Sequence, residues 1–103
     1  MRMLMKVEIP TEAGNAGFKK GSFVQAIQET LNRTRAEAAY FTTVNGCRGG
    51  YIIFDLDDVA KIPHMAEPLF LALGAKIELT PCFTPEGLQQ AAADIEKDVQ
   101  TFG

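Results

Sequence analysis

Apolar and polar positions alternate at the start of the chain. Residues 3–9 place methionine, valine and isoleucine at every second position, and Pro10 follows them. Alternation with a period of two predicts a strand that buries one of its faces. Residues 76–80 alternate in the same way before Pro81, and they predict the last strand of the chain.

Two segments in the middle of the chain predict a β-hairpin. Residues 38–44 and 50–56 are both rich in aromatic and β-branched side chains. Asn45-Gly46 lies between them, and this pair favours a type I′ turn because both residues tolerate positive φ angles. A loop of two residues also fixes the register of the two strands against each other.

Apolar residues recur every three or four positions in two further segments, which predicts amphipathic helices. The first helix is expected from about residue 18 to residue 34, after a glycine-containing segment, 14–21, that we interpret as a loose connection. The second helix covers residues 62–73. Pro68 interrupts it, so either the helix kinks there or its regular part begins near Met65.

A third helix is expected at the end of the chain. Thr84, Pro85 and Glu86 form a typical helix start, and residues 88–102 carry an apolar stripe. The order is therefore strand, helix, strand, strand, helix, strand, helix. With right-handed crossovers, this order predicts an α+β fold of the ferredoxin-like βαββαβ type with an extra C-terminal helix. The antiparallel sheet has the order 4-1-3-2, and residues 1–103 form a single domain.

The predicted register sorts the side chains between two faces of the sheet, and it places Tyr40 directly opposite Tyr51. The face under the first two helices collects Met3, Met5, Val7, Ala39, Phe41, Ile52, Phe54, Leu56, Ile77 and Leu79. The other face carries Leu4, Lys6, Glu8, Tyr40, Thr42, Tyr51, Ile53, Asp55, Glu78 and Thr80. The second face is too polar for a core and too aromatic for ordinary surface, so we expect a partial cover over it.

The chain resembles the dimeric α/β-barrel superfamily. The resemblance rests on the run Tyr51–Asp58, followed by a short helix, a charged strand and a proline-containing exit into another helix. The layout is most similar to that of muconolactone isomerase-like proteins. In this superfamily two ferredoxin-like sheets pack face to face, with pockets between each sheet and its cover. The resemblance implies a homodimer through the face that bears Tyr40 and Tyr51, but it selects no reaction, because its members have diverse activities.

The composition of the chain argues against a membrane span and against a nucleic-acid partner. The chain is 47% hydrophobic and 22% charged, and no apolar run is long enough to span a membrane. A net charge of −3 argues against a nucleic-acid partner. No secretory signal is recognisable, so we expect a cytoplasmic protein. Cys47 and Cys82 are expected to be free thiols at opposite ends of the sheet.

Five residues are candidates for a site. His64 and Asp55 are the candidate catalytic residues, because an imidazole can transfer a proton and a carboxylate can orient it. The alternative is an exposed histidine at a helix start. Tyr40, Tyr51 and Thr42 are candidates for substrate binding, and the alternative for the tyrosines is a cross-strand pair that stabilises the sheet. One histidine with two distant cysteines predicts no metal site, and no cofactor is expected.

Two functions remain open. The first is a metal-free isomerase or related enzyme that acts on a small hydrophobic or cyclic metabolite. The second is a non-catalytic dimeric domain that binds a ligand or assists another protein. A strongly perturbed pKa inside a closed pocket would favour the enzyme, whereas a filled interface without a cavity would favour the accessory domain.

Overall fold

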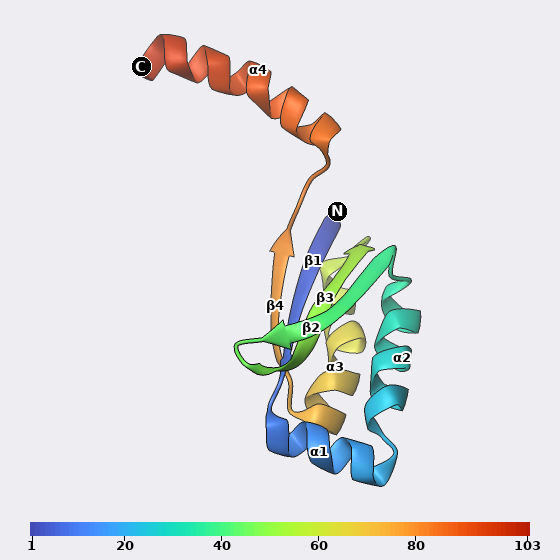
Figure 1. The fold of residues 1–103 in the computed structure, drawn as a ribbon. Coiled ribbons are helices and arrows are strands. Elements are labelled where there is room, and N and C mark those ends of the chain that lie inside the picture. Colours follow the sequence, from blue (N-terminus) through green and yellow to red (C-terminus); the bar gives the residue numbers. More distant parts are fainter.

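The computed structural model describes residues 1–103, and Figure 1 shows its strands and helices in order along the chain. The strands are β1 (Arg2–Ile9), β2 (Ala38–Val44), β3 (Cys47–Asp55) and β4 (Lys76–Pro81). The helices are α1 (Thr11–Lys20), α2 (Phe23–Thr34), α3 (Ile62–Leu73) and α4 (Pro85–Phe102), with a short 3₁₀ turn, η1 (Val59–Lys61), before α3.

The four strands form one antiparallel sheet in the order β2-β3-β1-β4, as the sequence predicts. β1 lies in the middle and pairs with both β3 and β4. Cys47 starts β3 beside the hairpin turn, whereas Cys82 donates its backbone N–H to Arg2 at the other end of the sheet. Both cysteines are free, so the prediction of two unpaired thiols is confirmed.

The predicted hairpin is confirmed in its turn and its register. Asn45 and Gly46 both have positive φ angles, 50° and 77°, as a type I′ turn requires. Tyr40 pairs with Tyr51 across β2 and β3. Val44 pairs with Cys47 directly beside the turn, as the predicted register requires, so the ladder begins at Cys47.

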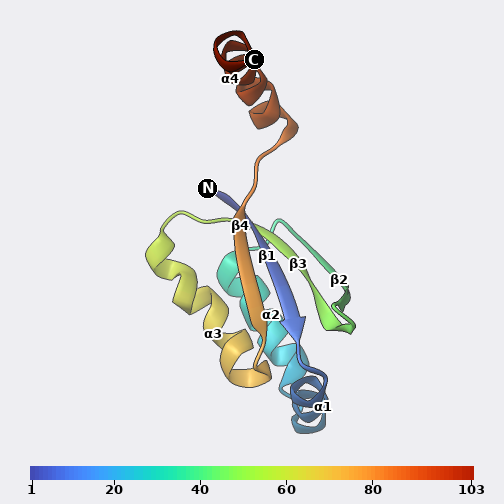
Figure 2. The same ribbon diagram turned by 90° about the vertical axis from the view of Figure 1, so that its left-hand side faces the viewer.

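Helices α2 and α3 lie against one face of the sheet, and the opposite face carries no helix (Figures 1 and 2). Phe54 and Leu69 are completely buried between these layers. The core cluster consists of Met3, Met5, Val7, Ile9, Ala26, Ile52, Phe54, Leu56, Met65, Leu69, Leu73 and Ala75. The predicted floor of the core is wrong at Phe41, which is 60% exposed. This residue lies on β2, at the edge of the sheet, where the helices no longer cover it.

The interpretation of residues 14–21 as a loose connection is wrong. Thr11–Lys20 form α1, and Gly21, with a φ angle of 76°, separates it from α2. Gly17 is buried, and a Cβ atom there would lie 2.8 Å from the side chain of Leu73. Glycine at this position therefore lets α1 approach α3 closely, which is a packing role rather than a sign of flexibility.

Helix α3 is regular from its first turn. Asp58 caps the preceding 3₁₀ turn, because its side chain accepts a hydrogen bond of 2.9 Å from the backbone N–H of Ala60. The helix then begins at Ile62 and includes Pro68, so the alternative start near Met65 is wrong. Gly74 ends the helix in a left-handed conformation, as predicted.

Helix α4 projects away from the rest of the molecule (Figures 1 and 2). Its predicted cap is present, since the Thr84 hydroxyl accepts a hydrogen bond of 3.3 Å from the backbone N–H of Gly87. None of its residues is buried. The radius of gyration is 17.1 Å, whereas a compact chain of this length has a value of about 13 Å. The helix therefore covers neither face of its own sheet.

Candidate functional site

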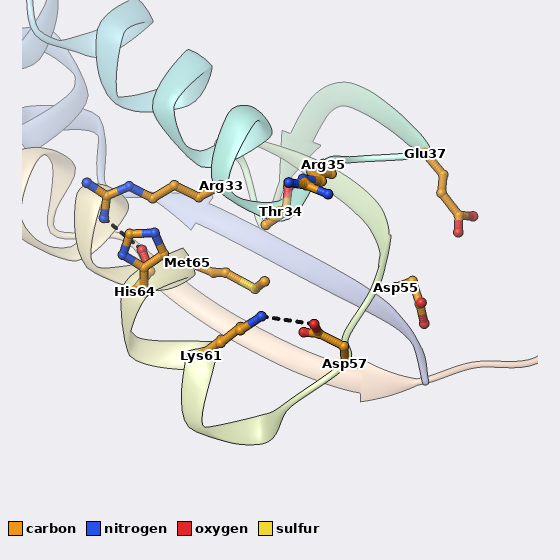
Figure 3. Close-up of a pocket in the computed structure, with 9 residues that line it drawn as sticks. All are labelled: Arg33, Thr34, Arg35, Glu37, Asp55, Asp57, Lys61, His64 and Met65. Atoms are coloured by element: carbon orange, nitrogen blue, oxygen red, sulfur yellow. Dashed lines mark hydrogen bonds and ion pairs between the residues drawn. The ribbon is translucent and has the colours of Figure 1, made fainter.

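A polar pocket of about 460 Å³ lies at the end of the sheet where β3 finishes, and Figure 3 shows the residues that line it. The lining brings together residues from the end of α2, the loops on either side of the β2–β3 hairpin, η1 and the start of α3. They are Arg33, Thr34, Arg35, Glu37, Asp55, Asp57, Lys61, His64 and Met65.

The end of α2 positions the arginine-rich wall of this pocket. Thr34 is buried, and its hydroxyl donates a hydrogen bond of 2.8 Å to the carbonyl of Thr30 within the helix. The helix ends at Arg35, which adopts a left-handed conformation with a φ angle of 51°. Glu37 then donates its backbone N–H to the carbonyl of Ile53 and so joins the sheet. These contacts fix the backbone on both sides of Arg35.

Arg33 ties α2 to the start of α3. Its Nε atom donates a hydrogen bond of 2.9 Å to Glu29, and its Nη1 atom donates one of 2.8 Å to the carbonyl of His64. The bond to His64 involves the backbone carbonyl, so it holds the residue in place. The imidazole itself has no hydrogen-bond partner in the chain. His64 is exposed at the pocket wall.

An ion pair joins η1 to the loop after β3. The Lys61 ammonium lies 2.9 Å from the Asp57 carboxylate, and both side chains are more than half exposed. The hydrogen bond from Lys61 lowers the pKa of Asp57 below its usual value. Asp57 is therefore held in its charged form and is a poor donor of protons near neutral pH.

The remaining carboxylates of the pocket are also paired. Asp55 accepts a hydrogen bond of 2.8 Å from the amino group of Met1. Glu37 binds Arg2 through two hydrogen bonds of 2.9 and 3.0 Å, which raise the pKa of the guanidinium. Among the arginines and lysine of the lining, Arg35 alone forms no ion pair. A ligand with a negatively charged group would find a free partner there.

The two predicted catalytic residues line the same pocket but do not contact each other. Figure 3 shows His64 on the α3 wall and Asp55 on the far side, beyond Asp57. No hydrogen bond joins the imidazole to Asp55. The predicted pair of a proton-transferring histidine and an orienting aspartate is therefore not assembled in the single chain.

The predicted substrate-binding residues lie elsewhere. Tyr40 and Tyr51 are directly opposed on the uncovered face of the sheet, and neither lines a cavity of the chain. Thr42 lies two residues further along β2 and lines a second, apolar groove near the hairpin. The five predicted site residues are thus divided among a polar pocket, an open face and an apolar groove.

Three basic residues of the pocket are missing from the sequence-based set. They are Arg33, Arg35 and Lys61. In the sequence each of them looks like an ordinary surface residue, because the pattern does not show that the end of α2 lies near η1. The sequence signal that comes closest to indicating this basic cluster is the occurrence of Arg33 and Arg35 together at the end of a helix. No group of three or more His, Cys, Asp and Glu side chains lies close enough to hold a metal ion.

Comparison with known proteins gives no family for this chain. No protein-family model matches the sequence, and no curated protein matches it either. The likeness to muconolactone isomerase-like proteins therefore stays a prediction. None of the helices combines the length and apolar character needed to cross a membrane.

Proposed function

We propose that this protein is a ferredoxin-like domain of the dimeric α/β-barrel type, which works as a homodimer and binds a small molecule without transforming it. The observation that carries this proposal is that one chain leaves two apolar surfaces uncovered, one face of its sheet and the stripe of α4. A second copy would supply a cover for both.

The uncovered face of the sheet has an apolar centre with charged borders. Leu4, Tyr51 and Ile53 lie on neighbouring strands at this centre, where β1 pairs with β3. Towards β4, Lys6 and Glu78 approach to 3.9 Å, and so do Lys76 and Glu8. Two copies related by a twofold axis would bury this centre and keep the ion pairs at the rim, which is the usual anatomy of an interface.

The apolar stripe of α4 is a second surface that a second copy of the chain could cover. Leu88, Ile95 and Val99 are each 54–61% exposed, although they form one helical face. An isolated helix is only marginally stable in water, and most of its stability in proteins comes from packing of its apolar face. Cys82 still donates its backbone N–H to Arg2, and Thr84 is extended, so the chain leaves β4 without turning back over its own sheet. The stripe is therefore available to another copy.

The polar pocket is the proposed ligand site. Its volume lies within the range of ordinary ligand pockets, roughly 300–1,000 Å³. Most of its charges are already paired, and Arg35 offers a free cation for an acidic group of the ligand. Binding is favoured over catalysis because the pocket holds no base that is oriented by a second side chain.

The homodimer is tested by placing a charge at the centre of the uncovered face. Ile53→Lys should give a particle of one chain mass in light scattering at high micromolar concentration, whereas the unchanged protein should give two. Gln28→Lys is the matched control, because it adds the same charge at an exposed position of α2, on the helix side of the sheet. A dimer that survives Ile53→Lys, or a monomeric unchanged protein, would contradict the proposed interface.

The ligand site is tested by nuclear magnetic resonance with a set of small polar metabolites. A ligand with an acidic group should shift the amide signals of Arg35 and His64, and Arg35→Gln should weaken its binding at least tenfold. Arg33→Gln is not a suitable control, because Arg33 also supports the backbone of His64. Lys20→Gln is suitable, since Lys20 is exposed and lines no cavity of the chain. Ligands that shift only signals outside the pocket would contradict the assignment.

A metal-free isomerase or related enzyme is the second candidate. It is favoured by one observation, the presence of both His64 and Asp55 on the wall of one pocket. If the protein turns over a metabolite found by screening, His64→Ala and Asp55→Asn should each reduce the rate by about 10²–10⁴. Tyr40→Phe should do the same if a tyrosine of the interface takes part. Activity that survives all three changes would exclude these residues as the catalytic group.

A further inference from the structure

A second cavity lies on the helix side of the sheet, near the hairpin and far from the polar pocket. This apolar groove has a volume of about 350 Å³ and separates α1 and α2 from the start of β3. It shares no residue with the polar pocket. Its lining is Ile9, Phe18, Phe23, Val24, Ile27, Phe41, Thr42, Thr43, Arg48 and Gly49.

The walls of the apolar groove are large apolar side chains that remain in water. Phe18, Val24 and Phe41 come from three different elements, and each is at least half exposed. The ring of Phe18 stacks on Phe23 with the centroids 4.1 Å apart. Exposed apolar side chains are common one at a time, but three around one concave surface are typical of a binding groove.

Arg48 is held at the rim of the apolar groove by several contacts. Its Nη1 atom donates a hydrogen bond of 3.0 Å to the side-chain oxygen of Asn15. Its guanidinium lies 5.1 Å from the ring centroid of Phe18 and 6.0 Å from that of Phe23. A Cβ atom at Gly14 would lie 2.8 Å from Nη1, so glycine at this position of α1 makes room for the guanidinium.

The charge of Arg48 has no acidic partner in the chain. No carboxylate lies within 4.0 Å of its guanidinium, whereas Arg2 and Arg33 both form ion pairs. A guanidinium presents five N–H donors in a planar fork, and Asn15 accepts from one of them. The donors that remain fit the two oxygens of a carboxylate.

We propose that the apolar groove binds a monocarboxylate with an apolar body, whose carboxylate pairs with Arg48 and whose body lies against Phe18, Val24 and Phe41. The volume suits a small molecule. The acidic helix α4 of a second copy is a poorer occupant, because its 18 residues extend about 27 Å, far beyond a groove of this size. This site is additional to the polar pocket and does not depend on the homodimer.

The experiment is a titration of the full-length protein with 3-phenylpropionate, followed by amide signals in nuclear magnetic resonance. The shifts should map to the lining of the apolar groove. The uncharged analogue 3-phenylpropionamide has the same shape, and it should bind at least tenfold more weakly. Equal binding of acid and amide would overturn the role of Arg48, and an acid that shifts no groove signal would overturn the site.

Variants separate the charge from the apolar walls. Arg48→Gln should remove the preference for the acid and leave weak binding of both probes, whereas Arg48→Lys should keep part of the preference. Val24→Glu places a negative charge in the groove, at an exposed position of α2, and should abolish binding of the acid. Lys20→Gln is the matched control, because it removes one positive charge at an exposed position of α1 that lines neither cavity, and it should leave the affinity for the acid unchanged.

One further outcome would overturn the proposal. If the acid shifts the signals of α4, for example those of Ile95, together with the groove signals, it displaces a helix of a second copy. The apolar groove would then be a helix-binding site rather than a small-molecule site. The proposal is supported if the groove signals shift, the α4 signals do not, and the shifts become smaller in Arg48→Gln.

Discussion

Helices α2 and α4 have the same kind of amphipathic pattern but opposite surroundings. Both carry apolar residues at spacings of three and four, although the side chain of Thr84 caps the start of α4 and Ser22 makes no such bond at the start of α2. In α2, Ala26 and Thr30 are buried against the rest of the molecule. In α4 no residue is buried, and Ile95 and Val99 face solvent.

An apolar stripe thus indicates that a helix has a partner, but not where the partner is. For α2 the connections are short, and the sheet of the same chain supplies the cover. For α4 the extended segment after β4 carries the helix beyond its own sheet (Figure 1). We therefore propose that a second copy supplies the cover.

The largest effect is expected in the covered region. Phe54 is completely buried in the core, so Phe54→Ala should lower the free energy of unfolding by about 3–5 kcal/mol. Urea denaturation followed by circular dichroism measures this loss. A loss below about 1 kcal/mol would mean that Phe54 is not packed in the core.

A smaller but more specific effect is expected in α4. Ile95→Glu places a charge on the apolar stripe and should raise the dissociation constant of the homodimer at least 100-fold, which corresponds to about 2.7 kcal/mol. Gln90→Glu is the matched control, because it adds the same charge on the polar side of the helix. Sedimentation equilibrium measures both constants. Equal constants for the two variants would show that the stripe is not part of the interface.

The helix cap gives the next effect. Thr84→Ala removes the acceptor of the hydrogen bond from Gly87 and should destabilise α4 by about 1 kcal/mol. Amide hydrogen exchange should become faster in Pro85–Phe102 and stay unchanged in α2 and α3. Faster exchange throughout the chain would indicate that α4 and the remainder unfold as one unit.

The smallest effect is expected from pH. The backbone N–H of Glu86 and the Thr84 hydroxyl hold the pKa of the Glu86 carboxyl below its ordinary value of 4.5. A lowered pKa in the folded helix means that Glu86 stabilises α4 fully above pH 4.5 and loses this contribution as the pH falls further. Circular dichroism of Glu86→Gln should therefore show a weaker acid dependence of helix content than the unchanged protein. An identical dependence would contradict the assignment.

Much of the fold could be predicted from local rules. Alternation set the faces of β1 and β4, and the Asn45-Gly46 turn set the hairpin register, because these signals act over a few residues. The prediction was wrong for α1, since Gly17 was interpreted as a flexible residue. Its role depends on Leu73, which is 56 positions away and cannot be recognised from spacing alone.

The site could be predicted only in part, for the same reason. His64 and Asp55 were selected by chemistry, and both line one pocket. Arg35 was missed because its importance comes from the position of a helix end relative to η1. Arg48 was missed because its lack of an acidic partner is a property of the folded surface. The roles of Arg35 and Arg48 both depend on tertiary contacts, and such contacts leave no local pattern in the sequence.

We propose that a second copy covers both the uncovered sheet face and the stripe of α4. The most direct test is an isotope-filtered nuclear Overhauser measurement on a mixture of labelled and unlabelled protein. We expect contacts between the two copies at the methyl groups of both Ile53 and Ile95. If Ile95 shows contacts only within its own chain, α4 folds back over its own sheet, and this result would contradict a cover by a second copy.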